Sequence, residues 1–249
     1  MIRIKTPDEI EAIARSGRII ADLYRELPER VMPGVSTGQL DRFAEEFIRS
    51  HDGAEPAFKG LYGFPATLCT SVNEEVVHGI PSVRRVLAEG DVLSVDCGVK
   101  LDGFYSDSAV TLPVGEIDEA ATLLLEVTER ALAAGIREAV AGRRLGDLGA
   151  AIQAVGEEAG YGVVRDLVGH GVGHEPHEEP QVPNWGRSGR GMKIPVGLVI
   201  AIEPMFNAGT RGIKTLDDRW TVVTSDRGIS AHFEHTVAVT EEGPRVLTR

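Results

Sequence analysis

Cysteine, aromatic residues and long apolar runs are all scarce in this sequence of 249 residues. The two cysteines, Cys69 and Cys97, form no C-x-x-C pair, which argues against a disulfide framework and indicates a reducing compartment. The longest apolar run, 197–202, is far too short to cross a bilayer, and no apolar segment follows the charged first residues. We therefore expect a cytoplasmic protein that has neither a signal peptide nor a membrane as a partner.

Positive charge is also in the minority. Acidic side chains number 38 against 26 basic ones, which gives a formal net charge of −12. Because a negative field repels phosphate groups, the composition argues against DNA as a partner. Hydrophobic residues make up 42% of the chain, as in ordinary globular proteins, so disorder is excluded as the main state. No Pro-, Gly- or Ser-rich linker divides the chain, and we predict a single domain over residues 1–249.

The same order of elements, two helices and then several strands, occurs twice along the chain. The segment Thr6–Glu9 has the form of a capping box and predicts a helix to about Tyr24, and a second helix is expected from about Thr37. Helical spacing returns at about 120–140 and 148–159. The expected strands are 67–72, 92–99, 104–111, 163–168, 198–203, 220–224 and 231–240.

A residue echo at an offset of 108 supports a repeat, as from Gly38 to Gly146. The pattern predicts an α+β fold with internal pseudo-symmetry, in which helices flank antiparallel strands. The further matched pairs are Gly34 with Gly142, Leu40 with Leu148, and Phe47 with Val155.

Two aspartates lie inside neighbouring predicted strands. If the turn between the strands is Leu101-Asp102, then Asp96 and Asp107 stand directly opposite each other, and if the turn is Asp102-Gly103 they sit one diagonal apart. Both registers put the two acids on one face of the sheet, because side chains alternate with period two. Like charges so close favour a cation between them, and the alternative is a surface hairpin with two solvated acids.

Two glutamates and a histidine cluster add to this pair. Glu203 ends a predicted strand just before Pro204, and Glu234 lies within another. A carboxylate in a strand is costly to bury without a partner, whereas an isolated one usually lies at an edge or faces solvent. Four strand carboxylates therefore favour a shared site. Three of the seven histidines lie in one glycine-rich segment: His170, His174 and His177.

Carboxylates with one imidazole make an oxygen-rich ligand set. Such a set suits Mn(II), Fe(II), Co(II) or Zn(II), and five side chains hold two ions when carboxylates bridge, as in two-metal hydrolases. Cys97 points to the face opposite Asp96, so we exclude it as a ligand. The candidate ligands are Asp96, Asp107, His170, Glu203 and Glu234.

Several motifs together resemble those of the type I methionine aminopeptidases, metallopeptidases of the pita-bread fold. The likeness covers nearly the whole chain and implies a pseudo-twofold repeat of helices packed on a curved antiparallel sheet. The matching stretches are 71–81 (SVNEEVVHGIP), 95–107, 169–173 with 177–180 (HEEP), 202–205 (IEPM) and 233–236 (FEHT).

The resemblance also implies two divalent metal ions as cofactors. By this likeness Asp96 binds one ion, Asp107 and Glu234 bridge both, and His170 and Glu203 complete the second. The ligand set accepts Co, Mn, Fe(II) or Zn, so the identity of the metal and the occupancy of one or two ions stay open.

Roles toward the substrate follow from the same resemblance. His78 would lie near the amine end of the substrate, and His177 would hydrogen-bond the scissile carbonyl or its tetrahedral intermediate. Glu203 would carry a proton between the attacking water and the leaving amine. The implied methionine pocket is apolar, because a thioether makes no strong hydrogen bonds, and its lining is Phe58, Leu61, Phe64, Cys69 and Trp220.

Three positions depart from the family pattern or fall outside it. Pro176 stands where the family often has a bulky aromatic residue, and Leu61 stands where an aromatic is frequent. Both put the fit of the second substrate residue in question. His174 has no family role and is expected on the surface.

The implied activity is removal of the initiator methionine from nascent chains whose second residue is small and uncharged, by a monomer near the ribosome exit. The type I assignment rests on the short span between Glu203 and Glu234 and on a core that starts at once. The alternatives are a proline-specific (Xaa-Pro) peptidase on the same fold, which usually carries an extra N-terminal domain, and a non-catalytic pita-bread binding protein, which would have lost ligands.

Overall fold

The computed structural model describes residues 2–249. Four α-helices and one 3-10 helix occur among them: α1 (Pro7–Glu26), α2 (Thr37–Arg49), η1 (Leu61–Gly63), α3 (Glu119–Glu138) and α4 (Leu145–Glu158). The strands are β1 (Ala54–Pro56), β2 (Leu68–Val72), β3 (Glu75–Val77), β4 (Val92–Leu101), β5 (Phe104–Pro113), β6 (Gly162–Val163), β7 (Gly169–Gly171), β8 (Glu178–Val182), β9 (Val199–Ile202), β10 (Met205–Asn207), β11 (Ile213–Thr215), β12 (Val222–Thr224), β13 (Ser230–His232), β14 (Glu234–Thr240) and β15 (Gly243–Val246).

The first helix begins at the predicted capping box. The Thr6 hydroxyl accepts from the backbone N–H of Glu9, while the Glu9 carboxylate accepts from the backbone N–H of Thr6. Pro7 occupies the first helical position, where its missing N–H costs nothing. The other three predicted α-helices are confirmed within a few residues of their expected ends.

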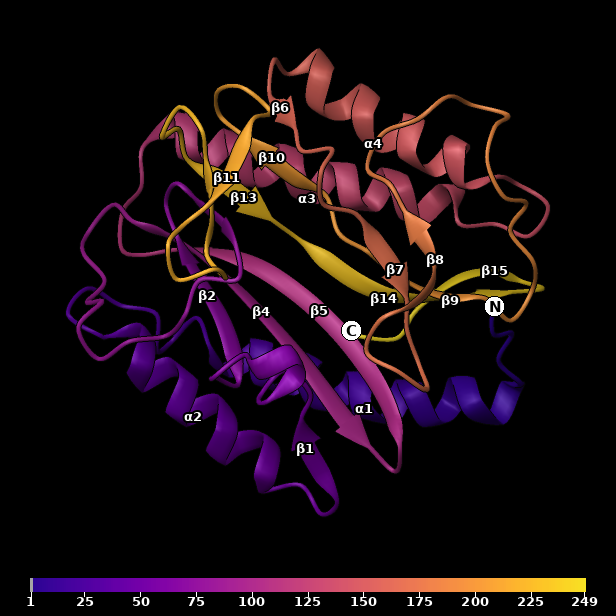
Figure 1. The fold of residues 1–249 in the computed structure, drawn as a ribbon, viewed down its shortest axis with the longest axis horizontal. Coiled ribbons are helices and arrows are strands. Elements are labelled where there is room, and N and C mark those ends of the chain that lie inside the picture. The colour runs from indigo at the N-terminus through magenta and orange to yellow at the C-terminus, as the bar shows by residue number, and fades with distance from the viewer. Residues whose placement is uncertain (1) are drawn as a thin grey trace.

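A nine-stranded sheet runs through the middle of the molecule. Its main path is β1-β4-β5-β14-β9-β7-β8, with β2 paired on β4 and β15 paired on β14, and every pairing is antiparallel. Figure 1 shows α1 and α2 on one side of the long strands and α3 and α4 on the other. Because β5 and β14 pair directly, strands from both halves of the chain meet at the centre of one sheet.

The predicted internal repeat is confirmed by matching details in the two halves. An isolated bridge joins Ser36 to Val86 in the first half, and another joins Arg144 to Lys193 in the second. A glycine lies close to each bridge, near the start of α2 and of α4. Only glycine fits these two positions, because a Cβ at Gly38 would lie 2.7 Å from a backbone nitrogen and a Cβ at Gly146 would also meet backbone atoms. The offset of 108 therefore marks positions with the same packing role.

Each half has its own hydrophobic core under the shared sheet. In the first half, side chains of α1 and α2 pack on strands β2 and β4, with Leu23, Leu40 and Leu93 fully buried. In the second half, α3 and α4 pack on β9, β10 and β14 around Leu148 and Phe206. Along β4, Asp96 alternates with the core residues Val95 and Cys97, so this acid lies on the face of the sheet turned away from the core of the first half.

Two predicted strands are wrong in extent. The segment 163–168 pairs only at its start, as β6, and Leu167 then turns into a cavity. The segment 231–240 is broken at Phe233, whose N–H donates to the carbonyl of Pro204 (3.3 Å). The chain changes partners there, because β13 pairs with β10 whereas β14 pairs with β5 and β9.

Candidate metal centre and substrate pocket

The β4–β5 hairpin decides between the two registers for its aspartates. Leu101 pairs with Phe104, so the turn is Asp102-Gly103, and Asp96 faces Ala109 while Asp107 lies opposite Gly98. The two acids therefore sit one diagonal apart on the same face. Cys97 points away from them into the core of the first half, as predicted.

The second half brings its glutamates to the same face. Glu234 pairs with Ala109, which also pairs with Asp96, so the two acids flank a small side chain across three strands. Ile202 pairs with His235 on the opposite face, and Glu203 follows Ile202 by one residue, which turns its side chain toward Glu234.

His170 from β7 completes the group. Its Nε2 atom lies 3.8 Å from Asp107 Oδ2 and 3.6 Å from Glu203 Oε1. Two sets of possible ligand atoms, each within 4.8 Å of one another, share the carboxylate of Glu234. They are Asp96, Asp107 and Glu234 on one side, and His170, Glu203 and Glu234 on the other.

Unpartnered polar atoms show that this cluster suits a cation. Among residues 2–249, no hydrogen-bond partner faces the buried atoms Asp96 Oδ1, Asp107 Oδ1 or Glu234 Oε1. Buried polar atoms normally have partners, and carboxylate oxygens left free at a common point are what a divalent ion requires. The donor set thus fits the metal that the sequence predicts.

Burial dominates the electrostatics of the carboxylate and histidine side chains. It raises the pKa of Asp107 to about 7, and burial together with the Asp107 charge raises the pKa of Glu203 and Glu234 well above the usual range. Burial and the neighbouring His177 lower the pKa of His170 to about 4. The carboxyls therefore hold protons near neutral pH without a metal, while His170 is neutral and free to bind one.

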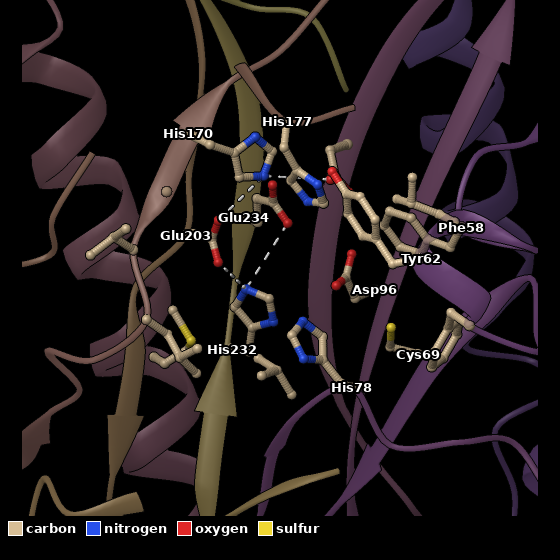
Figure 2. A pocket seen from close by; sticks show the side chains of 18 of the residues that line it. Phe58, Tyr62, Cys69, His78, Asp96, His170, His177, Glu203, His232 and Glu234 are labelled. Carbon is tan, nitrogen blue, oxygen red and sulfur yellow. Dashed lines mark ion pairs between the residues drawn. The ribbon is translucent and has the colours of Figure 1, made fainter. Parts of the chain in front are cut away.

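The two other predicted histidines stand on either side of the cluster, as Figure 2 shows. Burial lowers the pKa of His78, and partial burial lowers the pKa of His177, which is exposed on its outer side, so both imidazoles are neutral at pH 7. The ring of His177 packs edge-on against His170 with centroids 4.5 Å apart. Neutral imidazoles here can donate a hydrogen bond without adding a charge.

An apolar pocket adjoins the cluster in a cavity of about 590 Å³. Phe64 and Trp220 meet edge to face with centroids 5.1 Å apart, and Phe58 and Cys69 are buried beside them. All twelve predicted site residues line this one cavity: Phe58, Leu61, Phe64, Cys69, His78, Asp96, Asp107, His170, His177, Glu203, Trp220 and Glu234.

Among the cavity residues that the sequence did not predict, His232 and Tyr62 lie against predicted site residues. His232 is buried, with its Nε2 atom 3.8 Å from Glu203 Oε2 and 4.0 Å from Glu234 Oε2. Tyr62 is exposed, and its ring stacks on His177 at 6.0 Å. Their positions depend on the break at residue 233 and on a left-handed backbone at Tyr62 (φ 51°), and neither has a clear sequence signal.

The three departures from the family pattern have different outcomes. Leu61 lines the cavity, whereas Pro176 is buried outside its lining. His174 is partly exposed, as expected, but it also has partners, because its Nε2 atom lies 2.9 Å from Glu9 and its ring packs on Phe104. His174 therefore fastens its loop to α1.

Comparison with known proteins decides the family. The profile of metallopeptidase family M24 matches residues 11–241. The chain belongs to this family. It is 52% identical to a methionine aminopeptidase of Clostridium acetobutylicum, over 100% of this chain and 99% of that protein. It is 51% identical to methionine aminopeptidase 1 of Bacillus subtilis, over the full length of both. Within family M24, the chain therefore groups with the methionine aminopeptidases, and it is a metal-dependent peptide hydrolase.

Solved structures confirm the expected pita-bread fold. The methionine aminopeptidase of Thermotoga maritima superposes with a TM-score of 0.98 at 44% identity, covering 100% of both chains. The prolidase of Pyrococcus furiosus superposes with a TM-score of 0.77 at 25% identity, over 99% of this chain but only 65% of the prolidase. The M24 fold is thus shared with proline-specific enzymes that have longer chains.

Proposed function

We propose that this protein removes the N-terminal methionine from proteins and peptides, preferring a small, uncharged second residue. One observation carries the proposal: an apolar pocket lined by Phe58, Phe64 and Trp220 opens directly beside the carboxylate and histidine cluster. A methionine side chain among Phe58, Phe64 and Trp220 would make sulfur–aromatic contacts. The peptide bond after that first residue would then lie over the carboxylates.

The carboxylates and His170 would hold two divalent ions. Asp96 and Asp107 lie on one side and His170 and Glu203 on the other, with Glu234 common to both sets of ligands. Bound ions would activate a water molecule and polarise the scissile carbonyl. Their identity among Co, Mn, Fe(II) and Zn is a matter of availability, because this oxygen-rich set accepts each of them.

Three side chains would carry the proton and charge changes of the reaction. His177, neutral and beside His170, would donate a hydrogen bond to the carbonyl oxygen as it becomes an oxyanion. His78 would contact the substrate's amine end. Glu203, whose pKa burial raises, would accept a proton from the attacking water and deliver it to the leaving amine.

We further propose that residues 1–249 act as one catalytic domain and as a monomer. One chain supplies every predicted ligand and pocket residue of the cavity, and the central sheet joins both halves. No helix among residues 2–249 is long and apolar enough to span a membrane. The two cysteines are free and buried, which suits a cytoplasmic enzyme that meets nascent chains near the ribosome exit.

A peptide panel tests the proposal. The protein is stripped of metal, Mn(II) or Co(II) is added back, and peptides headed Met-Ala, Met-Glu and Ala-Pro are offered together and followed by mass spectrometry. We expect metal-dependent loss of methionine from the Met-Ala peptide alone. Trimming of the Ala-Pro peptide would move the protein to the proline-specific enzymes, and silence with every metal would favour a non-catalytic role.

A further inference from the structure

A buried ion pair ties the N-terminal segment to the loop that carries His177. The Nζ atom of Lys5 lies 2.6 Å from Glu178 Oε2, and the two side chains are 0% and 4% exposed. Residues 173 positions apart in the chain are thus joined where water cannot screen their charges. Although burial works to raise it, the pKa of Glu178 is lowered, because Lys5 donates a hydrogen bond to its carboxylate. The Glu178 carboxylate is therefore charged at neutral pH.

The other oxygen of Glu178 shapes the loop itself. Glu178 Oε1 accepts hydrogen bonds from the backbone N–H groups of His174 (2.7 Å) and Glu175 (3.1 Å). The carboxylate thus closes the loop from 173 to 178 on one side and binds Lys5 on the other. A buried carboxylate with these partners has its position determined by several bonds at once.

Lys5 packs so closely against two glycines, Gly173 and Gly197, that neither position has room for a side chain. A Cβ on Gly173, whose φ is +149°, would lie 2.7 Å from Lys5 Cε. A Cβ on Gly197, at φ +83°, would lie 2.7 Å from the Lys5 carbonyl oxygen, and the Lys5 N–H donates to the Gly197 carbonyl at 2.8 Å. The lysine is therefore fixed at both its backbone and its side chain.

His177 needs such an anchor because its own ring has few contacts. Among residues 2–249, no side chain or backbone group makes a hydrogen bond with the imidazole of His177. In the part of the chain that the structure describes, its ring meets two aromatic neighbours, His170 at 4.5 Å and the exposed Tyr62 at 6.0 Å, and one ring nitrogen lies within 4.8 Å of ligand atoms of Asp107 and His170. The orientation of His177 therefore depends on the backbone that Glu178, the next residue, holds in place.

We propose that Lys5 and Glu178 are positioning residues for His177, so that the N-terminal segment sets the geometry of the hydrogen bond to the scissile carbonyl. This inference rests on the proposed function of His177. A misplacement of about 1 Å at such a donor costs on the order of a hundredfold in rate. Glu178 lines the cavity and its charge acts on His170, but neither Lys5 nor Glu178 forms an ion pair with a residue of the carboxylate cluster, so metal binding is expected to survive their loss.

Measurements of kcat with His177 present and in a His177→Ala background test the proposal. In the metal-loaded enzyme, we expect Lys5→Met to lower kcat for a Met-Ala peptide by about ten- to a hundredfold, with metal content unchanged. The double variant Lys5→Met/Glu178→Gln keeps a hydrogen-bond acceptor for the loop and leaves no unpaired charge buried. We expect this double variant to fold and to show the same loss in kcat as Lys5→Met. In a His177→Ala background, either change is expected to lower kcat by no more than about twofold.

The control is Arg15→Met, which removes an exposed ion pair between α1 and Asp102 and is expected to leave kcat unchanged. Equal losses in both backgrounds, or no loss with His177 present, would overturn the inference. Hydrogen exchange at the His174 and Glu175 amides tests the tether without any peptide substrate. Faster exchange in Lys5→Met than in Arg15→Met supports it even if the parent released no methionine, and equal exchange would refute it.

Discussion

Removing one carboxylate from the predicted metal centre is expected to abolish most of the thermal stabilisation that added metal gives to the folded protein. In Asp107→Asn, the side chain keeps its shape but loses the charge that faces both Asp96 and His170. Because Asp107 is predicted to bridge the two ions, loss of its charge should weaken the binding of both ions rather than of one. The matched control is Asp102→Asn, which removes an exposed carboxylate from the turn of the same hairpin. His177→Ala serves as a second control that should keep both ions.

The magnitude follows from linkage between binding and folding. A ligand that binds only the folded state at a hundred times its Kd stabilises it by about 2.7 kcal/mol. For a chain of this length, each kcal/mol raises the Tm by about 2 °C, so a metal at that level should raise it by about 5 °C. In Asp107→Asn we expect a shift of no more than about 1 °C.

The shift should also depend on pH, with a sign set by the carboxyls. Their raised pKa values mean that protonation stabilises the metal-free fold at low pH, and this stability is lost as the pH rises through about 7, the pKa of Asp107. A metal must displace that proton, at a cost of about 1.4 kcal/mol per pH unit below 7. The lowered pKa of His170, about 4, keeps this ligand neutral from pH 8 to 5.5. The metal-induced rise in Tm should therefore shrink, as the pH falls from 7 to 6, by about 3 °C for each proton that the metal displaces.

Differential scanning calorimetry with and without Mn(II), at pH 7.5 and at pH 6, measures these shifts. Metal content by mass spectrometry gives the stoichiometry in the same samples. A rise in Tm for Asp107→Asn as large as that of Asp102→Asn would refute the assignment of Asp107 to the metal centre. A shift that stayed constant with pH would refute the account of proton competition.

Three further outcomes are expected. Thr236→Val removes a hydroxyl that accepts a hydrogen bond from the N–H of Asp107 (3.0 Å) and donates one to its carbonyl (2.7 Å). This change should lower the free energy of unfolding, measured in urea, by about 1–3 kcal/mol, whereas the control Thr122→Val, at an exposed position, should change it little. Gly146→Ala should cost about 1–3 kcal/mol in the same assay, because its Cβ meets backbone carbonyls. Trp220→Ala should raise KM for a Met-Ala peptide without changing metal content, since it opens the apolar pocket; an unchanged KM would place the methionine side chain elsewhere.

Local features of the fold were predictable from the sequence. The capping box at Thr6 and the helical spacing that follows act within a few residues, so α1 begins where the pattern predicts. The two aspartates of the hairpin share a face in either register because strand side chains alternate with period two. The choice of the turn Asp102-Gly103 needed the tertiary structure, since both turns satisfy the same local chemistry.

Contacts between distant segments were not predictable in the same way. His232 reaches the carboxylates because the chain changes sheets at Phe233, and that change depends on a bond to Pro204, 29 residues earlier. No periodicity in the sequence marks such a break. The pairing of Lys5 with Glu178 likewise had no local signal, because each residue by itself has the form of an ordinary surface charge.

Local patterns in the chain predict the helices, the apolar strands, the repeat and the acids and histidines that need partners, because burial of charge is a local cost that any fold must meet. The resemblance carried by its motifs added the family. The folded chain shows which of these groups share a cavity and what holds them there. That outcome depends on the pairing of β5 with β14 and on the packing of the N-terminal segment against the loop of His177, and both join residues more than 120 positions apart.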